Sequence, residues 1–259
     1  MRLNEAHLQT REQKLETTLL RPNWHILLVR PESMTFVMLI VGIVVGSLLS
    51  PYFLDVKYIL RSFTLTAEFS IAALVLTLVI IAGEIDLSPA SNMALSACLF
   101  AYAQAAGVPM PIAIFIGLAA GLAMGAFNAV MVIRFQLPSI IVTIGTLILF
   151  RGLAQVIAGD KSIRVVDWFI GINNHLIMGV PLPVIIFLIA SIVLGLVLNM
   201  TTYGRQIYQI GTNETAARHS GIKSKQIKFG LFLLIGVVSA ICGIMTASRL
   251  GSVRYDLGL

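Results

Sequence analysis

Long stretches without a charged side chain are the feature that most constrains this sequence. A membrane-spanning helix needs about 20 consecutive, mainly apolar residues, because each residue advances the helix by about 1.5 Å. Several of the stretches reach that length, and the longest has room for two crossings. The apolar/polar alternation of a membrane β-barrel is absent. The charge-free stretches are Ser33–Leu54, Phe69–Gly83, Leu87–Ile133, Phe135–Phe150, Trp168–Gly204 and Phe229–Ser248.

The composition agrees with a membrane protein. Of the 259 residues, 58% are hydrophobic and only 12% are charged, whereas soluble domains carry about 25% charged residues. We therefore predict an all-α, polytopic transmembrane bundle of about seven spans, with Met1–Glu32 as a cytoplasmic tail and Ser33–Leu259 as the transmembrane domain. The expected spans are Met34–Leu49, Ser62–Ala82, Pro89–Ala106, Ile112–Ile133, Pro138–Ile157, Pro181–Met200 and Phe229–Ala247.

The net charge of +6 comes mainly from two segments that flank apolar spans, Met1–Glu32 and Thr201–Lys228. Cytoplasmic loops of membrane proteins carry an excess of Lys and Arg, so the pattern indicates topology rather than nucleic-acid binding. If the amino terminus is cytoplasmic, alternation through the spans puts both segments and Arg134 inside, and the loop Ala158–Val180 outside. We expect a multi-pass protein of the bacterial inner membrane with a cytoplasmic amino terminus.

The sequence contains no pattern typical of an enzyme. It has no phosphate-binding Gly-rich loop followed by Lys and Ser/Thr, so we expect no ATP hydrolysis by this chain itself. Its four histidines are scattered, without the spacing of a catalytic triad or a metal site. Cys98 and Cys242 lie in separate apolar stretches and are expected to be small buried residues rather than a disulfide.

The segment Gly83–Pro89 interrupts an apolar region and carries Glu84 and Asp86. Because Phe69–Gly83 is too short to span the membrane alone, either Glu68 or this acidic pair lies near or within the hydrocarbon. A broken helix at that depth is tolerated only where it lines a cavity or is buried in protein. Two interpretations stay open: a gate or wall of a solute pathway, or an interfacial turn whose carboxylates meet headgroup water.

Other polar residues recur inside the spans, and most are expected to form hydrogen bonds between helices. Asn128 and Arg151 are more costly to desolvate, although Arg151 can also extend to the membrane interface. Gly117, Gly121 and Gly125 recur at a four-residue spacing and are expected to let two helices pack closely. The remaining polar residues are Ser91, Asn92, Ser96, Gln104, Thr143 and Thr146.

The basic segment Thr201–Lys228 is expected to contain a short cytoplasmic helix. Asn213 is a candidate N-cap, Glu214 and Arg218 have the i,i+4 spacing of an ion pair, and Gly221 is placed to end the helix. Two interpretations are open here as well. The helix is either a knob that another protein grips or part of a basic loop held near anionic lipid.

Three motifs resemble a known family. Glu84-Ile85-Asp86-Leu87-Ser88 resembles the "GIDLS" signature of the ribose/arabinose-type permeases of bacterial ATP-binding-cassette (ABC) importers, a family that includes rhamnose and autoinducer-2 permeases. Leu137–Thr146 followed by Phe150–Gly152 is similar to the "LP-x-x-IVTLGT…RG" stretch of that family. Tyr203–Arg205 with Gly211–Ile222 is similar to its cytoplasmic "G-x-N-x-x-AAR-x-SGI" loop. The motifs occur in the family's order.

The resemblance implies a permease subunit without a cofactor or metal of its own, which imports a monosaccharide or similar small polar solute by alternating access. The implied partners are an ABC ATPase subunit that holds ATP and Mg²⁺, a periplasmic solute-binding protein, a second permease copy or related permease, and membrane lipid. The implied ATPase-coupling residues are Gly211, Asn213, Glu214, Ala216, Ala217, Arg218 and Gly221. The candidate pathway residues are Glu84, Asp86, Ser88, Asn128, Thr143, Thr146 and Arg151.

Two departures from the family pattern are visible. Glu84 stands where the family usually has Gly, and family members continue for several more membrane helices beyond Leu259, so we expect a shortened version. Two other functions stay open. An ion-driven secondary transporter would use Glu68, Glu84 and Asp86 as ion sites and transport without ATP. A non-transporting scaffold or sensor subunit would give no solute flux with any partner.

Overall fold

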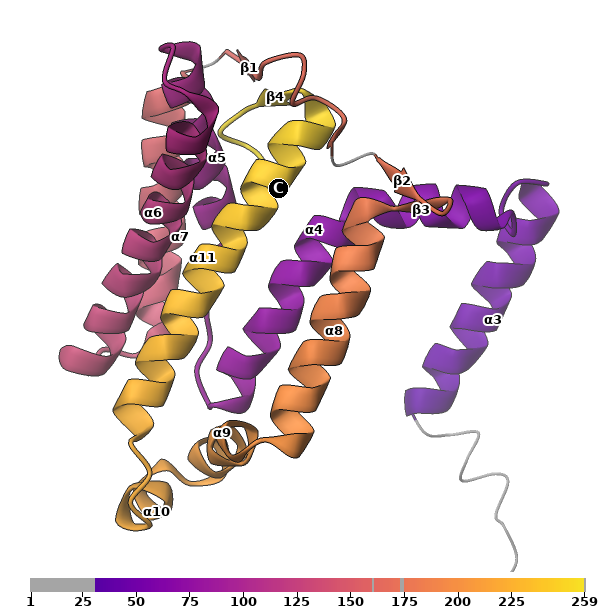
Figure 1. The fold of residues 1–259 in the computed structure, drawn as a ribbon. Coiled ribbons are helices and arrows are strands. Elements are labelled where there is room, and N and C mark those ends of the chain that lie inside the picture. Colours follow the sequence, from indigo (N-terminus) through magenta and orange to yellow (C-terminus); the bar gives the residue numbers. More distant parts are fainter. Residues whose placement is uncertain (1–30, 160, 173–174, 259) are drawn as a thin grey trace, which may run out of the picture. The chain divides into compact units, whose positions relative to one another are not determined.

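A computed structural model describes residues 31–159, 161–172 and 175–258, with side chains from residue 33 onward, so the predicted tail Met1–Glu32 lies outside the described residues except for the start of the first helix. These residues are mainly helical (Figure 1). The helices are α3 (Pro31–Leu49), α4 (Val56–Ile81), α5 (Pro89–Ala105), α6 (Met110–Ala129), the π-helix η1 (Val130–Arg134), α7 (Ser139–Ala158), α8 (Leu182–Met200), α9 (Thr202–Thr212), α10 (Glu214–His219) and α11 (Ser224–Leu250).

The described residues also contain four two-residue strands, which lie in the segments that connect or follow the helices. β1 (Ile163–Arg164) pairs antiparallel with β4 (Ser252–Val253), and β2 (Leu176–Ile177) pairs antiparallel with β3 (Val180–Pro181). The β1–β4 pair ties the loop after α7 to the segment after α11. The strands are connections between helices and do not form a layer of their own.

Each of the seven predicted spans lies on a helix, and the fold is the predicted all-α polytopic bundle. Among the described residues, five helices are long and apolar enough to cross a membrane: α4, α6 with η1, α7, α8 and α11. α5 has only 17 residues, and the described apolar part of α3 is also short of 18 residues. Membrane crossing by α3 and α5 therefore stays a prediction.

The chain divides into two compact units, residues 1–59 and 60–259. In the first unit, α3 is followed by a turn that packs the ring of Phe53 against Gly46. A Cβ atom at Gly46 would lie 2.6 Å from that ring, so glycine lets the ring lie directly on the helix backbone. The second unit contains the remaining helices and every site discussed below.

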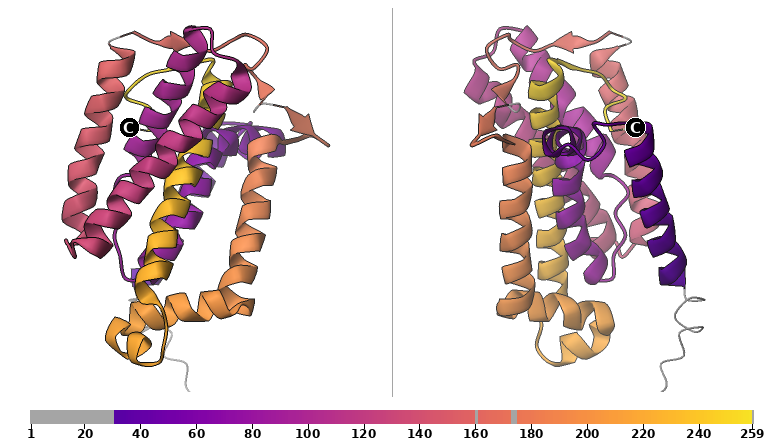
Figure 2. Two further views of the ribbon diagram at one scale, coloured as in Figure 1. Left: turned by 60° about the vertical axis from the view of Figure 1, so that its left-hand side comes forward. Right: turned by 90° about the vertical axis from the view of Figure 1, so that its right-hand side faces the viewer.

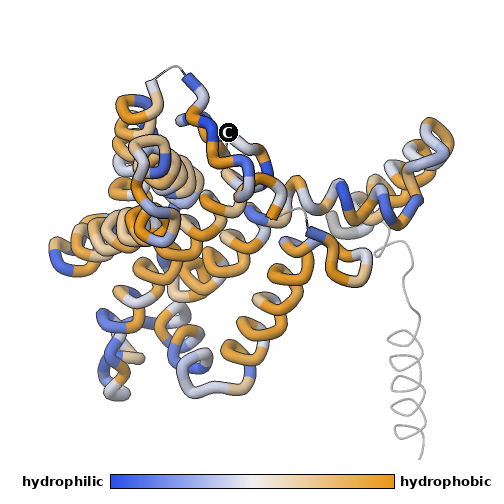
Figure 3. The backbone as a smooth tube through the Cα atoms, turned by 45° about the horizontal axis from the view of Figure 1, so that its top comes forward, coloured by the Kyte–Doolittle hydropathy of each residue, from blue (hydrophilic) through white to orange (hydrophobic). Residues whose placement is uncertain are grey.

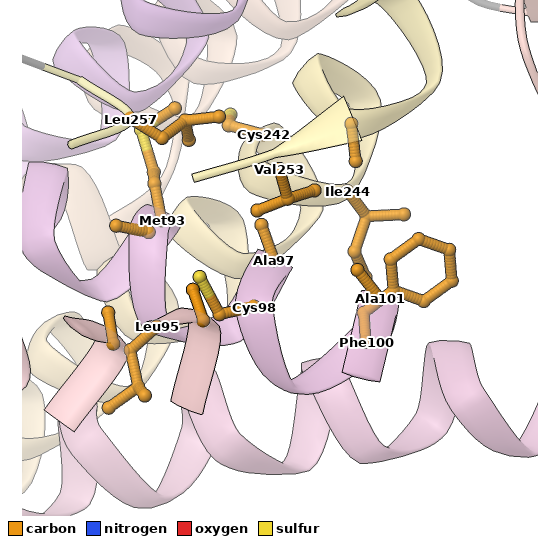
Figure 4. Packing of buried hydrophobic residues seen from close by; sticks show 14 of the residues in the cluster. Met93, Leu95, Ala97, Cys98, Phe100, Ala101, Cys242, Ile244, Val253 and Leu257 are labelled. Atoms are coloured by element: carbon orange, nitrogen blue, oxygen red, sulfur yellow. The ribbon is translucent and has the colours of Figure 1, made fainter. Parts of the chain in front are cut away.

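Helix α5 is the central helix of the second unit. It is packed against α6, α7 and α11 and is buried around most of its circumference. Small side chains allow this, because Ala94, Ala97 and Ala101 leave room for close neighbours. Cys98 and Cys242 are both free and buried in this core, as predicted (Figure 4).

The predicted glycine stripe lies between α6 and α11. A Cβ atom at Gly121 would lie 2.6 Å from the carbonyl oxygen of Gly236 and 2.5 Å from Cβ of Ala240. A Cβ atom at Gly125 would likewise meet the backbone carbonyl oxygen of Phe232, which lies on α11. The two backbones are therefore in direct contact, which confirms that the stripe serves helix packing.

The connections of the second unit gather at two opposite ends. Figures 1 and 2 show α9, α10 and the turn between α6 and α7 at one end, called here the α10 end, and β1 and β4 at the other. Arg134 and the segment 201–228 thus share one end, as alternation predicted. Apolar residues follow the long helices and hydrophilic residues concentrate at the ends (Figure 3), as a bundle with a lipid-facing middle requires.

Candidate functional site

The connection between α4 and α5, residues 82–88, is the helix break that the sequence predicted. Gly83 ends α4 with a φ of 83°, a conformation that favours glycine. The connection then leaves the α10 end and runs alongside the bundle toward α5 (Figure 1). Asp86 and Ser88 are only 3% and 1% exposed. The break therefore carries polar side chains into the protein interior rather than into an interfacial turn.

Side chains of α7 hold the backbone of the break. The amide of Ile85 donates to Ser139 Oγ at 3.1 Å, and Thr143 Oγ1 donates to the carbonyl of Ile85 at 3.2 Å. Irregular backbone at membrane depth needs such internal partners. Thr146, in contrast, donates to the carbonyl of Thr143 in its own helix, at 3.3 Å. Of the two threonines predicted for the pathway, Thr143 contacts the break directly.

Asp86, Ser88 and Asn128 form a buried polar cluster between the break and α6. Asp86 Oδ1 accepts from the amide of Ser88 at 2.8 Å and from Ser88 Oγ at 2.7 Å. Ser88 Oγ in turn accepts from Asn128 Nδ2 at 2.8 Å. Within the described residues, Asn128 Oδ1 is buried and accepts no hydrogen bond. The polar cluster thus offers one vacant acceptor in the interior, and a buried acceptor without a partner is costly.

Arg151 lies away from the polar cluster. Its Nη1 donates to the carbonyls of Tyr255 and Leu257, each at 2.6 Å. A charged donor that binds two carbonyls anchors the segment that follows α11. The arginine proposed for the pathway therefore contacts the chain near its described end.

Replacing Arg151 with methionine is expected to loosen residues 254–258. Hydrogen bonds to charged groups contribute about 1.5–3 kcal/mol each, so amide exchange in this segment should rise at least tenfold. Hydrogen–deuterium exchange in detergent would measure this rise. Arg134→Met, at an exposed arginine of η1, is the control and should leave exchange there unchanged. Equal exchange in wild type and Arg151→Met would contradict the anchoring role.

The predicted cytoplasmic helix is α10, and its caps are as expected. Asn213 Oδ1 accepts from the amide of Ala216 at 3.0 Å, which satisfies a free donor at the helix start. Gly221, with φ 84°, follows the end of the helix. Ala217 is buried, whereas Arg218 is exposed. One face of α10 thus packs on the protein and the other is open.

Helix α9 precedes α10 and is an addition to the one short helix that the sequence predicts within Thr201–Lys228. Gly204, Ile207 and Ile210 are its buried residues, and their three-residue spacing was the available signal. Gly211 near its end lies directly on the carbonyl of Ile81, the last residue of α4. A Cβ atom at Gly211 would overlap that carbonyl. The platform of α9 and α10 is therefore in backbone contact with the start of the break.

An ion triad joins the same elements. Lys228 Nζ donates to Glu84 Oε1 at 2.7 Å and to Glu214 Oε2 at 2.6 Å. The side chain of Lys228 is 9% exposed, that of Glu84 16% and that of Glu214 38%. The predicted i,i+4 pair between Glu214 and Arg218 is wrong. The carboxylate of Glu214 turns to the less solvated Lys228, where the attraction between opposite charges is stronger.

Glu68 also has a cationic partner. It is fully buried in α4, and Oε1 accepts from Arg249 Nε of α11 at 2.8 Å. The sequence left open whether Glu68 or the acidic pair Glu84 and Asp86 lies near or within the hydrocarbon, and the structure shows that the carboxylate of Glu68 is compensated by Arg249. Arg249 was missed because it lies far away in sequence and carries no local motif.

A cavity of about 340 Å³ opens beside the ion triad. It lies between the break, the turn from η1 to α7, and the start of α11. Gln136 on its wall has a φ of 57°, which is uncommon for a residue other than glycine. The charged residues that line the cavity are Glu84, Glu214, Arg218, Lys225 and Lys228.

Comparisons with known proteins agree with these features. The family profile described as "Branched-chain amino acid transport system / permease component" matches residues 58–259. The chain is 32% identical over 237 residues to the autoinducer 2 import system permease protein LsrD of Enterobacter sp. strain 638, covering 88% of this chain and 72% of that protein. It is 34% identical over 231 residues to LsrD of Escherichia coli strain K12, covering 85% and 69%. No solved structure matches the chain significantly.

Proposed function

Because the chain belongs to the family of branched-chain amino acid transport system permease components, we propose that it is the membrane-spanning subunit of an ABC importer for a monosaccharide or similar small polar solute. Membership of this family, together with the long apolar helices, makes it a multi-pass inner-membrane transport subunit rather than an enzyme. Two relatives are named as autoinducer 2 import permeases, so autoinducer 2 is the first solute to test.

The observation that carries this proposal is the contact between the α9–α10 platform and the helix break. An importer driven by a separate ATPase needs a cytoplasmic element that the ATPase moves, and a path from that element to the solute. Here Gly211 lies against the end of α4, and Lys228 binds one carboxylate from α10 and one from the break. A partner that displaces α10 thereby acts on residues 82–88.

The polar cluster is the proposed wall of the solute pathway. Asn128 Oδ1 is buried and has no hydrogen-bond partner within the described residues. It would accept a hydrogen bond from a hydroxyl group of a passing solute. Ser88 Oγ accepts from Asn128 and donates to Asp86, and Thr143 holds the backbone beside them. Glu84 stands at the α10 end of the same segment. Few polar groups suffice when a separate binding protein selects the solute.

An ion-driven transporter is supported less well. Of its three candidate ion sites, Glu68 and Glu84 are paired with a cation, Arg249 or Lys228, and Asp86 accepts hydrogen bonds from the amide and the hydroxyl of Ser88. A carboxylate already neutralised by a buried cation has little attraction left for a transported ion. The ATP-driven mechanism requires no such vacant site.

The proposed arrangement puts the α10 end and the amino terminus in the cytoplasm. The ATPase subunit, which holds ATP and Mg²⁺, would dock on α10, and the solute-binding protein would dock at the opposite end. A second permease copy or a related permease would complete the channel. Alternating access then follows from ATP-driven movement of α10.

Copurification tests the ATPase contact. The chain is co-expressed with the ATPase encoded beside its gene and purified in detergent. Arg218→Glu is expected to lower the recovered ATPase roughly tenfold, equivalent to about 1.4 kcal/mol of binding free energy. Arg218 is exposed on α10 and its partner contact would be lost without disturbing the fold.

The matched control is Arg164→Glu. Arg164 is an exposed arginine of the loop at the opposite end. Among the described residues it pairs with exposed Asp167, a kind of ion pair that contributes little. This variant should recover as much ATPase as wild type. A stable wild-type chain that recovers no ATPase, or equal losses in the two variants, would count against the proposed function.

A further inference from the structure

Lys228 is unusual because one buried ammonium group serves two carboxylates from two separate elements. Glu84 lies in the break and Glu214 is the first residue of α10, and both are in hydrogen-bond contact with Nζ. Burying charges costs desolvation free energy, so such an arrangement is weak evidence for stability. Its best-attested use is to fix one conformation among alternatives.

The contacts run without interruption from α10 to the polar cluster. Glu214 binds Lys228, Lys228 binds Glu84, and Glu84 is two residues from Asp86 along the extended break. The peptide between the two acids is held at Ile85 by side chains of α7. Movement at one end of this series therefore changes the position of the other.

Charge makes the series depend on Lys228. Two carboxylates and one ammonium group leave one net negative charge in a partly buried place. Without the ammonium group, the two carboxylates would repel each other across a medium of low dielectric constant. Lys228 therefore holds α10 itself to Glu84 of the break, beyond the backbone contact that Gly211 of α9 makes with Ile81.

We infer that Lys228 is a positioning residue that transmits displacement of α10 to the α4–α5 break, and so to the polar cluster. The inference rests on the proposed function, because it needs a partner that moves α10. It also gives a role to Glu84, which stands where the family usually has Gly. The additional carboxylate connects the break, through Lys228, to Glu214 of α10.

The test reads the conformation of the break directly. Leu87, 43% exposed between Asp86 and Ser88, is replaced with cysteine, and Cys98 and Cys242 with alanine. The complex with the ATPase is labelled with N-ethylmaleimide, without nucleotide and after trapping with ATP and vanadate. We expect the labelling rate of the otherwise wild-type complex to differ at least fivefold between the two states.

The decisive variant, called here the neutral pair, replaces the two more buried members of the triad by neutral residues of similar size, Glu84→Gln with Lys228→Met. Glu214 is kept because the ATPase is proposed to dock on α10, and its carboxylate, 38% exposed, can be solvated by water. The variant therefore leaves no fully buried unpaired charge and should fold and recover the ATPase. The nucleotide-dependent difference in labelling should fall below twofold. Lys225→Met is the matched control, because Lys225 is an exposed lysine on the same cavity wall with no ion pair among the described residues. It should keep the fivefold difference, and Lys228→Arg should keep most of it.

The outcomes separate the two proposals. If the neutral pair responds to nucleotide as strongly as the otherwise wild-type complex, the inference is overturned and the proposed function stands. If the otherwise wild-type chain recovers no ATPase or shows no nucleotide response, the proposed function fails and the inference fails with it. Loss of the response in the neutral pair, with ATPase recovery and the Lys225→Met response intact, supports both.

Discussion

Replacing Gly211 with alanine is expected to destabilise the chain by about 3 kcal/mol, which corresponds to a fall of about 6–12 °C in Tm. A Cβ atom there would overlap the carbonyl oxygen of Ile81 and lie 2.9 Å from its carbon. Both are backbone atoms, so no side chain can rotate to make room. The end of α9 must move away from α4, and the contacts of Ile207 and Ile210 in the core are lost with it.

The thermal unfolding of purified protein in detergent measures this effect. Gly145→Ala is the control, since nothing lies within 4 Å of a Cβ atom at that position of α7. Alanine is favoured over glycine in a helix by about 0.5–1 kcal/mol, so the control should unfold at the same or a slightly higher temperature. If both variants unfold like wild type, α9 is not seated on α4 as described.

The helices were predictable because the membrane imposes a simple requirement. A span must satisfy its own backbone and expose apolar side chains, and both demands are visible as charge-free stretches. Proline residues sharpen the boundaries. Pro89 stands at the start of α5 and Pro181 precedes α8, where the predicted spans also begin, because proline is tolerated only in the first turn of a helix.

Helix α9 was not predictable in the same way. The segment Thr202–Thr212 contains Gly204 and Gly211. Glycine disfavours helix in isolation, so local propensity did not indicate a helix there. In the structure Gly204 packs on the backbone of Val197 and Leu198, and Gly211 on that of Ile81. Tertiary contact therefore explains both glycines, and contact between distant segments cannot be read from local propensity.

The site was predictable in its members but not in its connections. Asp86 and Asn128 were identified because polar groups inside spans are costly, and Ser88 through the resemblance of residues 84–88 to a family signature. The hydrogen bond between Ser88 and Asn128, however, joins positions 40 residues apart. Glu214 was assigned to Arg218 by a local spacing rule, whereas its partner Lys228 lies beyond α10. Local rules give the pairs that a helix can make alone, and burial then decides which pair is made.

Replacing Asp86 with alanine is the second change expected to have a large effect. It should lower the free energy of unfolding by about 2–4 kcal/mol. It removes the acceptor of two buried donors, the amide and the hydroxyl of Ser88, and each buried donor left without a partner costs about 1–3 kcal/mol. Ser88 immediately precedes α5, and its carbonyl accepts from the amide of Asn92. Loss of Asp86 should therefore loosen the entry of α5 as well as the polar cluster.

Asp86→Asn separates hydrogen bonding from charge. The amide oxygen of asparagine can accept the same two hydrogen bonds, so this variant should lose less than about 1.5 kcal/mol, the usual difference between charged and neutral acceptors. Tm in detergent and hydrogen exchange of residues 84–92 measure both variants. Because about 1.4 kcal/mol corresponds to a tenfold change, exchange should rise at least about thirtyfold in Asp86→Ala and less than about tenfold in Asp86→Asn. Equal changes in the two would mean that the carboxylate charge, and not its hydrogen bonds to Ser88, holds the break in place.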